Sequence, residues 1–303
     1  EDAEEGESRL EIIRGKQVTT VTLETLLYGH EESVTSVAWH PDPEAVYGVR
    51  NMLISSSMDR TILLWSEGSN GVWMPLSRVG SAGGILGGSV GSSLLGFCGV
   101  TVQPVHGRAL VGHAYGGTLH IWELERSVPS VDSALPVEER ASNIHWKAAP
   151  CVTGHFGGVT DLCWEASAGR YLLTVSIDQT CRLWAPVDHV WVELARPQVH
   201  GYDLSSVTSV STEEHPHLLV TGADEKELRV FDAPKATLRI LEAAAGITHD
   251  DDSVPRVERA YIPSLGLSNK ASATDAAEED TSGEPGLDGS SASDQMRLPL
   301  ERD

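Results

Sequence analysis

The chain has 303 residues, enough for one large domain or two modest ones. Its 22 lysines and arginines stand against 44 aspartates and glutamates, giving a formal net charge of −22. Because such a charge repels phosphate backbones and anionic lipid surfaces, we expect no direct contact with DNA and no membrane partner. The sequence contains neither a run of about 18 apolar residues nor a signal-peptide pattern, so we expect no transmembrane helix.

The first 17 residues are predicted to form an acidic flexible segment. Six acids and two arginines occur within residues 1–14, and few of the side chains there are apolar. Such a composition is typical of a mobile segment or a surface insertion.

Residues 18–245 have the pattern of an all-β domain. Short runs rich in Val, Leu, Ile, Thr, Trp and Tyr are separated by Gly, Asp, Asn and Pro, which are strand and turn signals. Helical periodicity is hard to find in this region.

Four segments of this region repeat one another. They are SSSMDRTILLW (55–65), VGHAYGGTLHIW (111–122), TVSIDQTCRLW (174–184) and TGADEKELRVF (221–231). Each has the pattern of a strand, a tight turn and a second strand that closes on an aromatic residue. In two cases a Gly-His pair and an alternating strand, VTSVAW or VTDLCW, come before the repeat. The sequence therefore predicts four blades of a partial WD40 β-propeller.

The repeats also predict a buried hydrogen-bonded network in two blades, because buried polar side chains need partners and this set supplies them to each other. The predicted sets are His30, Asp59 and Trp65 in one blade, and His155, Asp178 and Trp184 in the other. A hydroxyl group completes each set: one of Ser55–Ser57 in the first, and Thr174 or Ser176 in the second. We interpret these residues as structural rather than catalytic.

The other two repeats depart from this set. Gly116 takes the place of the acid before Trp122, and Glu225 takes it before Phe231, which has no indole N–H. We expect these two blades to be held by packing alone.

No catalytic, cofactor or metal motif stands out. The run Gly87–Gly91 matches G-x-S-x-G, but no buried strand precedes it and no helical spacing follows it. The histidines show no metal-ligand spacing. The cysteines form no CxxC pair, so we expect reduced thiols and a cytoplasmic or nuclear protein; they are Cys98, Cys151, Cys163 and Cys181. We predict no cofactor, no metal and no enzyme activity.

Residues 246–303 are predicted to be a disordered, acidic, low-complexity linker or tail. Aromatic residues nearly vanish there, while Asp, Glu, Ser, Ala and Gly dominate. Such a segment buries too little apolar surface to offset its ordering entropy. One apolar island, YIPSLGLSNKA, interrupts it from Tyr261.

Several stretches are more specific than the WD40 consensus. They include ARPQVHGYD, GADEKELRVF, LGLSNKA and TGHFGGVTDLCWEASAGRYLLTVSIDQTCRLWAP. Together they resemble the family of WD40 subunits of the Elongator complex, from about Val18 to Ala271. The departures from the family include the absence of the earlier blades and of the second propeller, an unusually acidic and low-complexity segment at 272–303, and a short insertion after Trp184.

The resemblance implies a non-catalytic scaffold built from two propellers in tandem, of which this chain covers the later blades of the first. It implies as partners the largest Elongator subunit and the catalytic radical-SAM/acetyltransferase subunit. The assembly modifies the wobble uridine of tRNA, which this chain meets only through the complex. The alternative is a WD40 adaptor of another complex, for example in ubiquitin ligation or trafficking.

The loop ARPQVHGYDLS (195–205) is the preferred candidate for partner binding. Arginine and aromatic residues are enriched at interface hot spots, and the candidate residues are Arg196, His200, Tyr202 and Asp203. In the alternative interpretation, Pro197 and Gly201 only shape a turn between blades, with Tyr202 packed beneath it.

Overall fold

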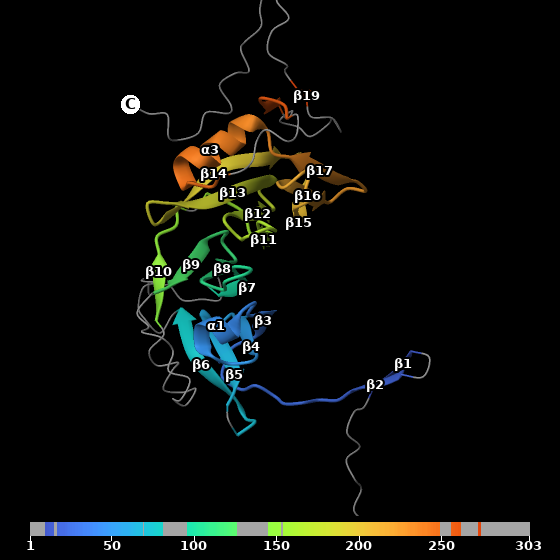
Figure 1. The fold of residues 1–303 in the computed structure, drawn as a ribbon, viewed down its shortest axis with the longest axis vertical. Coiled ribbons are helices and arrows are strands. Elements are labelled where there is room, and N and C mark those ends of the chain that lie inside the picture. Colours follow the sequence, from blue (N-terminus) through green and yellow to red (C-terminus); the bar gives the residue numbers. More distant parts are fainter. Residues whose placement is uncertain are drawn as a thin grey trace, which may run out of the picture.

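The computed structural model describes residues 10–14, 17–68, 70–80, 96–125, 145–152, 154–248, 256–261 and 272–273. Four antiparallel sheets lie one after another along an arc (Figure 1). Each sheet is one blade, which confirms the propeller architecture that the repeats predict. The segments at 81–95 and 126–144, including the Gly87–Gly91 run, lie outside the described residues.

The strands follow the repeats in order. Blade one contains β3 (Val34–Trp39), β4 (Met52–Ser57), β5 (Thr61–Glu67) and β6 (Trp73–Gly80). Blade two contains β7 (Phe97–Val102), β8 (Ala109–Ala114), β9 (Leu119–Leu124) and β10 (Trp146–Ala149). Blade three contains β11 (Val159–Trp164), β12 (Leu172–Ser176), β13 (Thr180–Val187) and β14 (Val190–Val199). Blade four has three strands among the described residues, β15 (Leu204–Val210), β16 (Leu218–Ala223) and β17 (Leu228–Asp232).

The turn between the second and third strand needs a left-handed residue in three blades. Arg60 (φ 69°) and Gln179 (φ 66°) follow the turn aspartates of blades one and three, and Gly117 (φ 83°) holds the same place in blade two. Only glycine adopts this conformation without a steric cost. Blade two therefore has the unstrained version of the turn.

Replacing Arg60 with glycine is expected to raise the free energy of unfolding by about 0.5 kcal/mol, and replacing it with valine to lower it by about 1–2 kcal/mol. The reason is that a β-branched side chain is the least compatible with a positive φ. Urea denaturation of both variants measures the effect. A valine variant as stable as the glycine variant would contradict it.

Threonines at equivalent positions join adjacent blades. The Thr35 hydroxyl donates to the carbonyl oxygen of Phe97 at 2.7 Å, and the Thr160 hydroxyl donates to that of Leu204 at 2.6 Å. Each bond runs from the first strand of one blade to the first strand of the next. The VT pair of the two complete repeats is thus an inter-blade contact.

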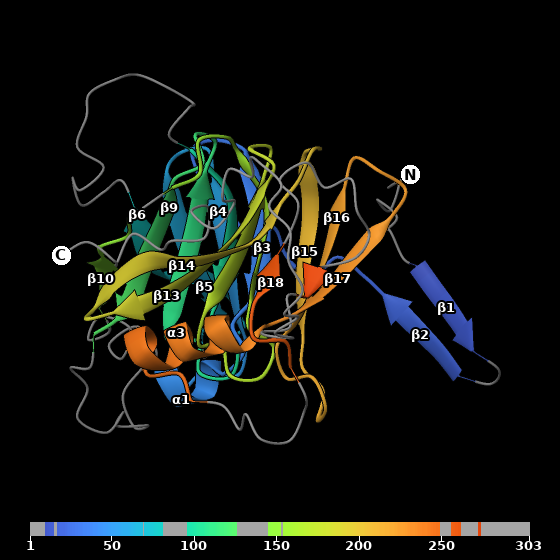
Figure 2. The ribbon, with the colours of Figure 1, turned by 90° about the horizontal axis from the view of Figure 1, so that it is seen from above.

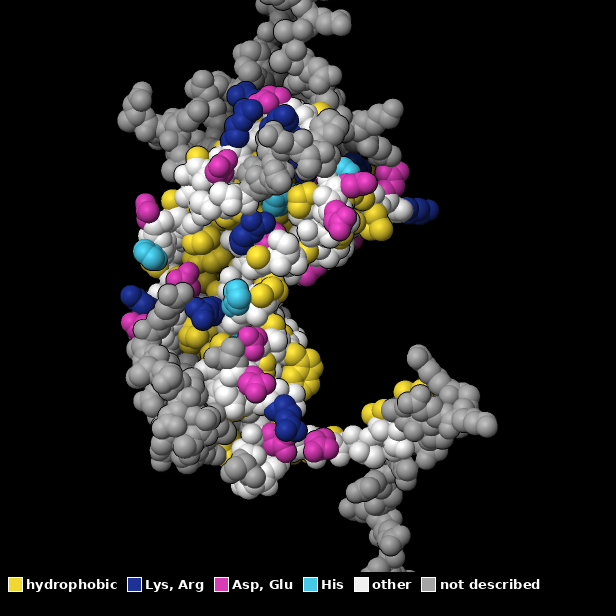
Figure 3. Space-filling model, in the orientation of Figure 1, with side chains coloured by type: hydrophobic (Ala, Val, Ile, Leu, Met, Phe, Trp, Pro, Cys, Tyr) yellow, Lys and Arg dark blue, Asp and Glu magenta, His cyan; other side chains and the backbone are white. Residues whose placement is uncertain are grey.

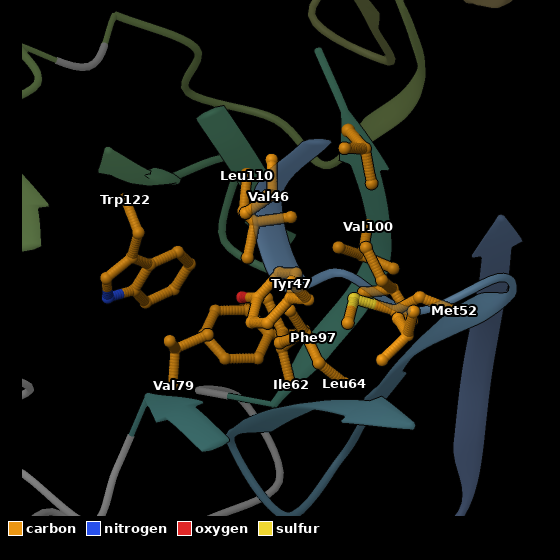
Figure 4. Close-up of a cluster of buried hydrophobic side chains, with 13 residues drawn as sticks. Val46, Tyr47, Met52, Ile62, Leu64, Val79, Phe97, Val100, Leu110 and Trp122 are labelled. Atoms are coloured by element: carbon orange, nitrogen blue, oxygen red, sulfur yellow. The ribbon is translucent and has the colours of Figure 1, made fainter. Parts of the chain in front are cut away.

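Apolar clusters fill the spaces between the blades. Blades one and two share the cluster of Figure 4, in which Phe97 and Trp122 pack edge to face with ring centroids 5.7 Å apart. Blades two and three share a second cluster, where Trp164 and Trp191 pack edge to face at 5.7 Å. The Trp191 indole N–H also donates to Glu123 at 2.9 Å. Buried aromatic pairs at this spacing stabilise by area and by geometry.

Two helices lie at the same end of the blades (Figure 2). Helix α1 (Pro43–Tyr47) connects β3 to β4, and its Tyr47 hydroxyl accepts from the Trp146 indole at 2.7 Å. Helix α3 (Lys235–Ala245) follows β17, and buries Leu238 and Leu241. We expected residues 18–245 to be strands and turns, and this helix departs from that expectation. Its apolar stripe spans only three turns, which is a weak periodic signal.

Helix α3 completes the third apolar cluster, which blades three and four share. Leu241 and Ile247 pack there with Leu194 of β14 and Leu204 of β15. Gly246 caps the C-terminus of the helix in a left-handed conformation, with a φ of 65°. The N–H groups of Gly246 and Ile247 donate to the carbonyl oxygens of Glu242 and Leu241 in the last turn.

Two short hairpins lie in the segments predicted to be flexible. Strands β1 (Leu10–Arg14) and β2 (Gln17–Val21) pair antiparallel and are drawn apart from the blades in Figure 1. The acidic segment of residues 1–17 is therefore structured in its last part, and residues 1–9 lie outside the described residues. Strands β18 (Ala260–Tyr261) and β19 (Ser272–Ala273) pair within the segment predicted to be a tail, most of which also lies outside.

The blades curve around a hollow on the side of their first strands (Figure 3). At the start of the arc, strand β3 exposes Val34, Val37 and Trp39, by 53%, 61% and 64%.

Within the described residues, no helix has the length and apolarity of a membrane span.

Candidate functional site: blade networks and the loops they hold

Blade one contains a hydrogen-bonded chain of four side chains. His30 Nδ1 donates to Asp59 at 2.9 Å, because the carboxylate can only accept. His30 Nε2 then accepts from the Ser55 hydroxyl at 2.7 Å, and the Trp65 indole N–H donates to the same hydroxyl oxygen at 2.8 Å. Of the three candidate hydroxyls, Ser55 is therefore the one that joins the histidine to the tryptophan.

Blade three repeats this chain. His155 Nδ1 donates to Asp178 at 2.8 Å, and His155 Nε2 accepts from Thr174 at 2.7 Å. The Trp184 indole donates to the Thr174 hydroxyl at 2.8 Å. The His155 and Asp178 side chains are fully buried. Both ring nitrogens of the histidine are used internally, so the geometry leaves no nitrogen to act on a ligand.

The turn acids also hold their own turns. The Asp59 side chain accepts from the N–H and the hydroxyl of Thr61, and Asp178 accepts in the same way from Thr180. Burial on its own raises the pKa of Asp59, but hydrogen bonds from Thr61, the Glu31 N–H and His30 outweigh it and lower the pKa to about 2. The pKa of Asp178 is lowered further, against a burial effect that raises it, by hydrogen bonds from His155 and Thr180 and by the charge of Arg182.

Arg182 gives blade three a charged pair that blade one lacks. It is 1% exposed, and its guanidinium donates to Asp178 at 3.0 Å and to Glu193 at 2.8 Å. The aligned residue in blade one is Leu63. Arg182 is not among the residues predicted from the sequence, although TCRLW differs from TILLW by this arginine, at a position that is apolar in the first repeat.

A second buried acid holds the connection between β11 and β12. Glu165 is fully buried and accepts from the Arg170 guanidinium at 3.0 Å, from the Ser167 hydroxyl and from two backbone N–H groups. Burial raises its pKa, but Arg170, Ser167 and the backbone N–H groups lower it more strongly, to about 2. Arg170 also donates to the Thr248 carbonyl beyond helix α3, at 3.0 Å. Glu165 therefore links a loop of blade three to the end of the helix.

Acidification is expected to destabilise the protein as the pH falls from 4.5 to about 2, because the pKa of Glu165 drops from 4.5 to about 2 on folding. The unfolded chain binds the proton more tightly, so the stabilisation is complete above pH 4.5 and is lost below it. The loss from this group is up to about 3 kcal/mol. Urea denaturation at a series of pH values should show a shallower acid limb for Glu165→Gln than for the wild type. Parallel curves would contradict the assignment.

Blade two lacks both the acid and the hydroxyl, in line with the sequence. Its His113 is 8% exposed, and Nδ1 has no hydrogen-bond partner among the described residues. Burial lowers the pKa of His113 to about 4, so the ring is neutral at pH 7.

Blade four was expected to be held by packing alone, and this expectation was wrong. His200 Nε2 donates to Glu225 at 2.9 Å, and Arg229 Nε donates to the same carboxylate at 2.8 Å. His200 lies four residues before β15, as His30 and His155 lie four residues before β3 and β11. The blade therefore keeps its histidine and acid, although Phe231 replaces the tryptophan.

This finding also corrects the prediction for the loop 195–205. The side chain of His200 is 1% exposed, so it belongs to the interior of the blade and is not available to a partner. Tyr202 is 52% exposed and packs edge to face on His200, with ring centroids 5.7 Å apart. The Arg196 side chain is 51% exposed and pairs with Glu193, and Asp203 is exposed. Three of the four candidates are therefore at the surface.

The cysteines are free thiols. Cys181 is buried and the other three are half-buried, and burial raises the pKa of Cys151 and of Cys163 to about 12. In the part of the chain that the structure describes, no group of three or more His, Cys, Asp or Glu side chains is placed to hold a metal ion.

Comparison with known proteins places these blades among WD40 repeats. The family model for the WD domain, G-beta repeat, matches residues 20–66 and 147–185. Among solved structures, the chain is similar to that of U3-55K, with a TM-score of 0.46 and 21% sequence identity, covering 68% of this chain and 51% of that one.

The similarity to one set of proteins is much higher. Elongator complex protein 2 of Drosophila melanogaster is 37% identical over 262 residues, and that of Homo sapiens is 36% identical over 266. Each alignment covers 83% of this chain and 29% of the relative. The protein of Schizosaccharomyces pombe is 32% identical over 261 residues, covering 85% of this chain and 30% of the relative. The chain thus spans about three tenths of the length of these curated relatives, and over that shared stretch it is similar to Elongator complex protein 2 and contains WD40 repeats.

Proposed function

We propose that this chain is part of a non-catalytic scaffold of the Elongator complex. The observation that supports this most is the similarity to Elongator complex protein 2, at 32–37% identity, in animals and a yeast. The blade interiors agree with it. The histidines and acids that resemble catalytic groups hold each other and their turns instead, as His155 and Asp178 do.

In this proposal the partners are the other Elongator subunits, namely the largest subunit and the catalytic radical-SAM/acetyltransferase subunit. The complex modifies wobble uridine in tRNA, in the cytoplasm and the nucleus. This chain supports the reaction by holding the other subunits in position, and it has no contact with tRNA except through the assembly. Its net charge of −22 favours protein partners over a direct contact with a phosphate backbone.

The exposed residues of the loop 195–205, Arg196, Tyr202 and Asp203, are the proposed contacts to a subunit. Arg196 lies on β14, the outer strand of blade three, and Tyr202 and Asp203 precede β15. An arginine and a tyrosine at the surface are residue types that anchor protein interfaces.

The experiment is affinity purification of the full-length parent protein, tagged at its own locus, followed by mass spectrometry. We expect both the largest and the catalytic subunit in stoichiometric amounts. Arg196→Glu should lower their recovery about tenfold. Lys147→Glu, which alters an exposed basic residue on the outer strand of blade two, is the matched control. Purification of the wild type without either subunit would overturn the proposal.

A further inference from the structure

Four exposed apolar side chains gather at one end of blades two to four. They are Tyr115, Phe156, Ile177 and Tyr202, exposed by 62%, 80%, 50% and 52%, and we call them the Phe156 patch. Tyr115 and Ile177 lie in the turns between the second and third strands, and Phe156 and Tyr202 lie in the loops before the first strands. In antiparallel blades these connections share one end, opposite helices α1 and α3 (Figure 2).

The loops of the patch touch one another. A Cβ atom on Gly117 would lie 2.2 Å from the carbonyl oxygen of Gly157, so the turn after Tyr115 contacts the loop after Phe156 directly. A Cβ atom on Gly157 would lie 2.7 Å from Cγ1 of Ile177. The three side chains therefore belong to one continuous surface across blades two and three.

A hydrogen bond extends this surface to blade four. The Gln179 side-chain N–H donates to Asp203 at 3.4 Å, which ties the turn of Ile177 to the loop of Tyr202. Tyr202 in turn packs on the buried His200 ring. The fourth side chain is thus fixed to the same framework.

The network of blade three holds Phe156 in place. Its backbone N–H donates to Asp178 at 3.3 Å, and the buried Arg182 guanidinium lies 6.0 Å from the centre of its ring. The loop of the most exposed aromatic side chain of the patch is thus bonded to the hydrogen-bonded network of the blade. Such preorganisation lowers the entropic cost of binding.

Tyr115, Phe156 and Ile177 lie in blades two and three, which have a described blade on either side, so their exposure does not come from the end of the arc, whereas Tyr202 lies in blade four, at that end. Blade two lies on one side of Phe156 and blade four beyond the other, so its neighbours are in place. In this it differs from Val37 and Trp39 of β3, which are exposed at the start of the arc. An exposed apolar surface made of several neighbouring side chains is typical of a binding site.

The charges at this end of the blades are mostly negative. The exposed acids in the same turns and loops are Glu31, Glu32, Asp203, Asp224 and Glu227, against the exposed Lys226 and the half-buried Arg60. On the outer strands, Arg78 donates to the Gly29 carbonyl and Arg196 pairs with Glu193. The connection 81–95 adds no charged residue. The patch therefore lies in a negative field that attracts cations.

We propose that the Phe156 patch binds a short segment of a partner protein that carries aromatic or branched aliphatic side chains beside lysine or arginine. The apolar side chains would pack on Phe156 and its neighbours, and the basic ones would face the surrounding acids. The inference deepens the scaffold role and rests on it, since it states the chemistry that one partner must have.

The test uses this chain and fluorescein-labelled peptides in fluorescence anisotropy. The probe carries two lysines on each side of a Phe-Leu pair; one control has glutamates for the lysines, and another has serines for the Phe-Leu pair. We expect the basic apolar probe to bind about tenfold more tightly than either control, and more weakly as salt is raised.

Two variants localise the binding. Phe156→Ser should weaken binding of the probe about fivefold or more, as expected for an anchor residue. Val72→Ser, a 55% exposed position between β5 and β6 at the opposite end, should leave it unchanged. If Phe156→Ser lowers stability in urea, Tyr115→Ser replaces it, because Tyr115 is not bound to the network.

Equal affinity for the basic and the acidic probe, or probe binding that both patch variants leave intact, overturns the proposal. So does a dimer of the chain that Phe156→Ser turns into a monomer, since the patch would then be covered by a second copy. These outcomes leave the scaffold role standing if the Elongator subunits still co-purify with the parent protein. Loss of those subunits with retained peptide binding would instead overturn the scaffold role alone.

Discussion

Replacing Asp178 with alanine is expected to lower the free energy of unfolding by about 3–5 kcal/mol, the cost of leaving a buried charge without its partner. The carboxylate accepts from His155, from Thr180 and from the guanidinium of Arg182, which is 1% exposed. Without it, Arg182 keeps only Glu193 as a charged partner.

The matched comparison is Asp59→Ala in blade one, where the same acid has a histidine and a threonine, and where Leu63 stands at the position aligned with Arg182. Its expected cost is about 1–3 kcal/mol, that of unsatisfied hydrogen-bonding groups. Urea denaturation followed by tryptophan fluorescence measures both. The double change Asp178→Ala with Arg182→Leu should recover part of the loss, because it also removes the buried charge that has lost one of its two partners. Equal losses for the two aspartates would show that Arg182 contributes nothing.

Replacing Thr174 with valine is expected to destabilise the protein by about 2–4 kcal/mol, since two buried groups lose their partner at once. The Thr174 hydroxyl donates to His155 Nε2 and accepts from the Trp184 indole N–H, at 2.7 and 2.8 Å. Valine has nearly the same shape, so the change removes the hydroxyl and leaves the packing intact.

Thr174→Ser provides the control. Serine keeps the hydroxyl and occurs naturally at the aligned position of blade one, as Ser55. Its cost is that of one methyl group, about 1 kcal/mol. The same denaturation measurement applies. A valine variant that is as stable as the serine variant would show that the hydrogen-bonded chain adds nothing to the stability of the blade.

The sequence by itself determined the fold of the blades and most of their two networks. A strand, a tight turn and a second strand that closes on an aromatic residue repeat four times, two of them with a turn aspartate, and repeated units have a repeated structural cause. The identities of His155, Asp178 and Trp184 follow from this, because each sits at a fixed distance from the strands. The sequence did not determine which hydroxyl joins the histidine to the tryptophan. Thr174 and Ser176 lie two residues apart on the same strand, so both face the same side of the sheet and both are candidates.

The tertiary structure decided what depends on contacts between blades and on burial. It placed His200 in the interior, where the sequence suggested a surface loop, because the acid that receives it, Glu225, lies 25 residues away. It added helix α3, whose two buried leucines are too few to give a strong period, but which packs against blade three.

Only the structure brings the Phe156 patch together. Its members come from blades two, three and four and are far apart in sequence, from Tyr115 to Tyr202. The sequence marks each as one apolar residue beside a turn, which on its own is ordinary for a protein surface. The antiparallel order of the strands brings these turns to the same end of the blades. The close approach of Gly117 to Gly157 places the turn of Tyr115 beside the loop of Phe156.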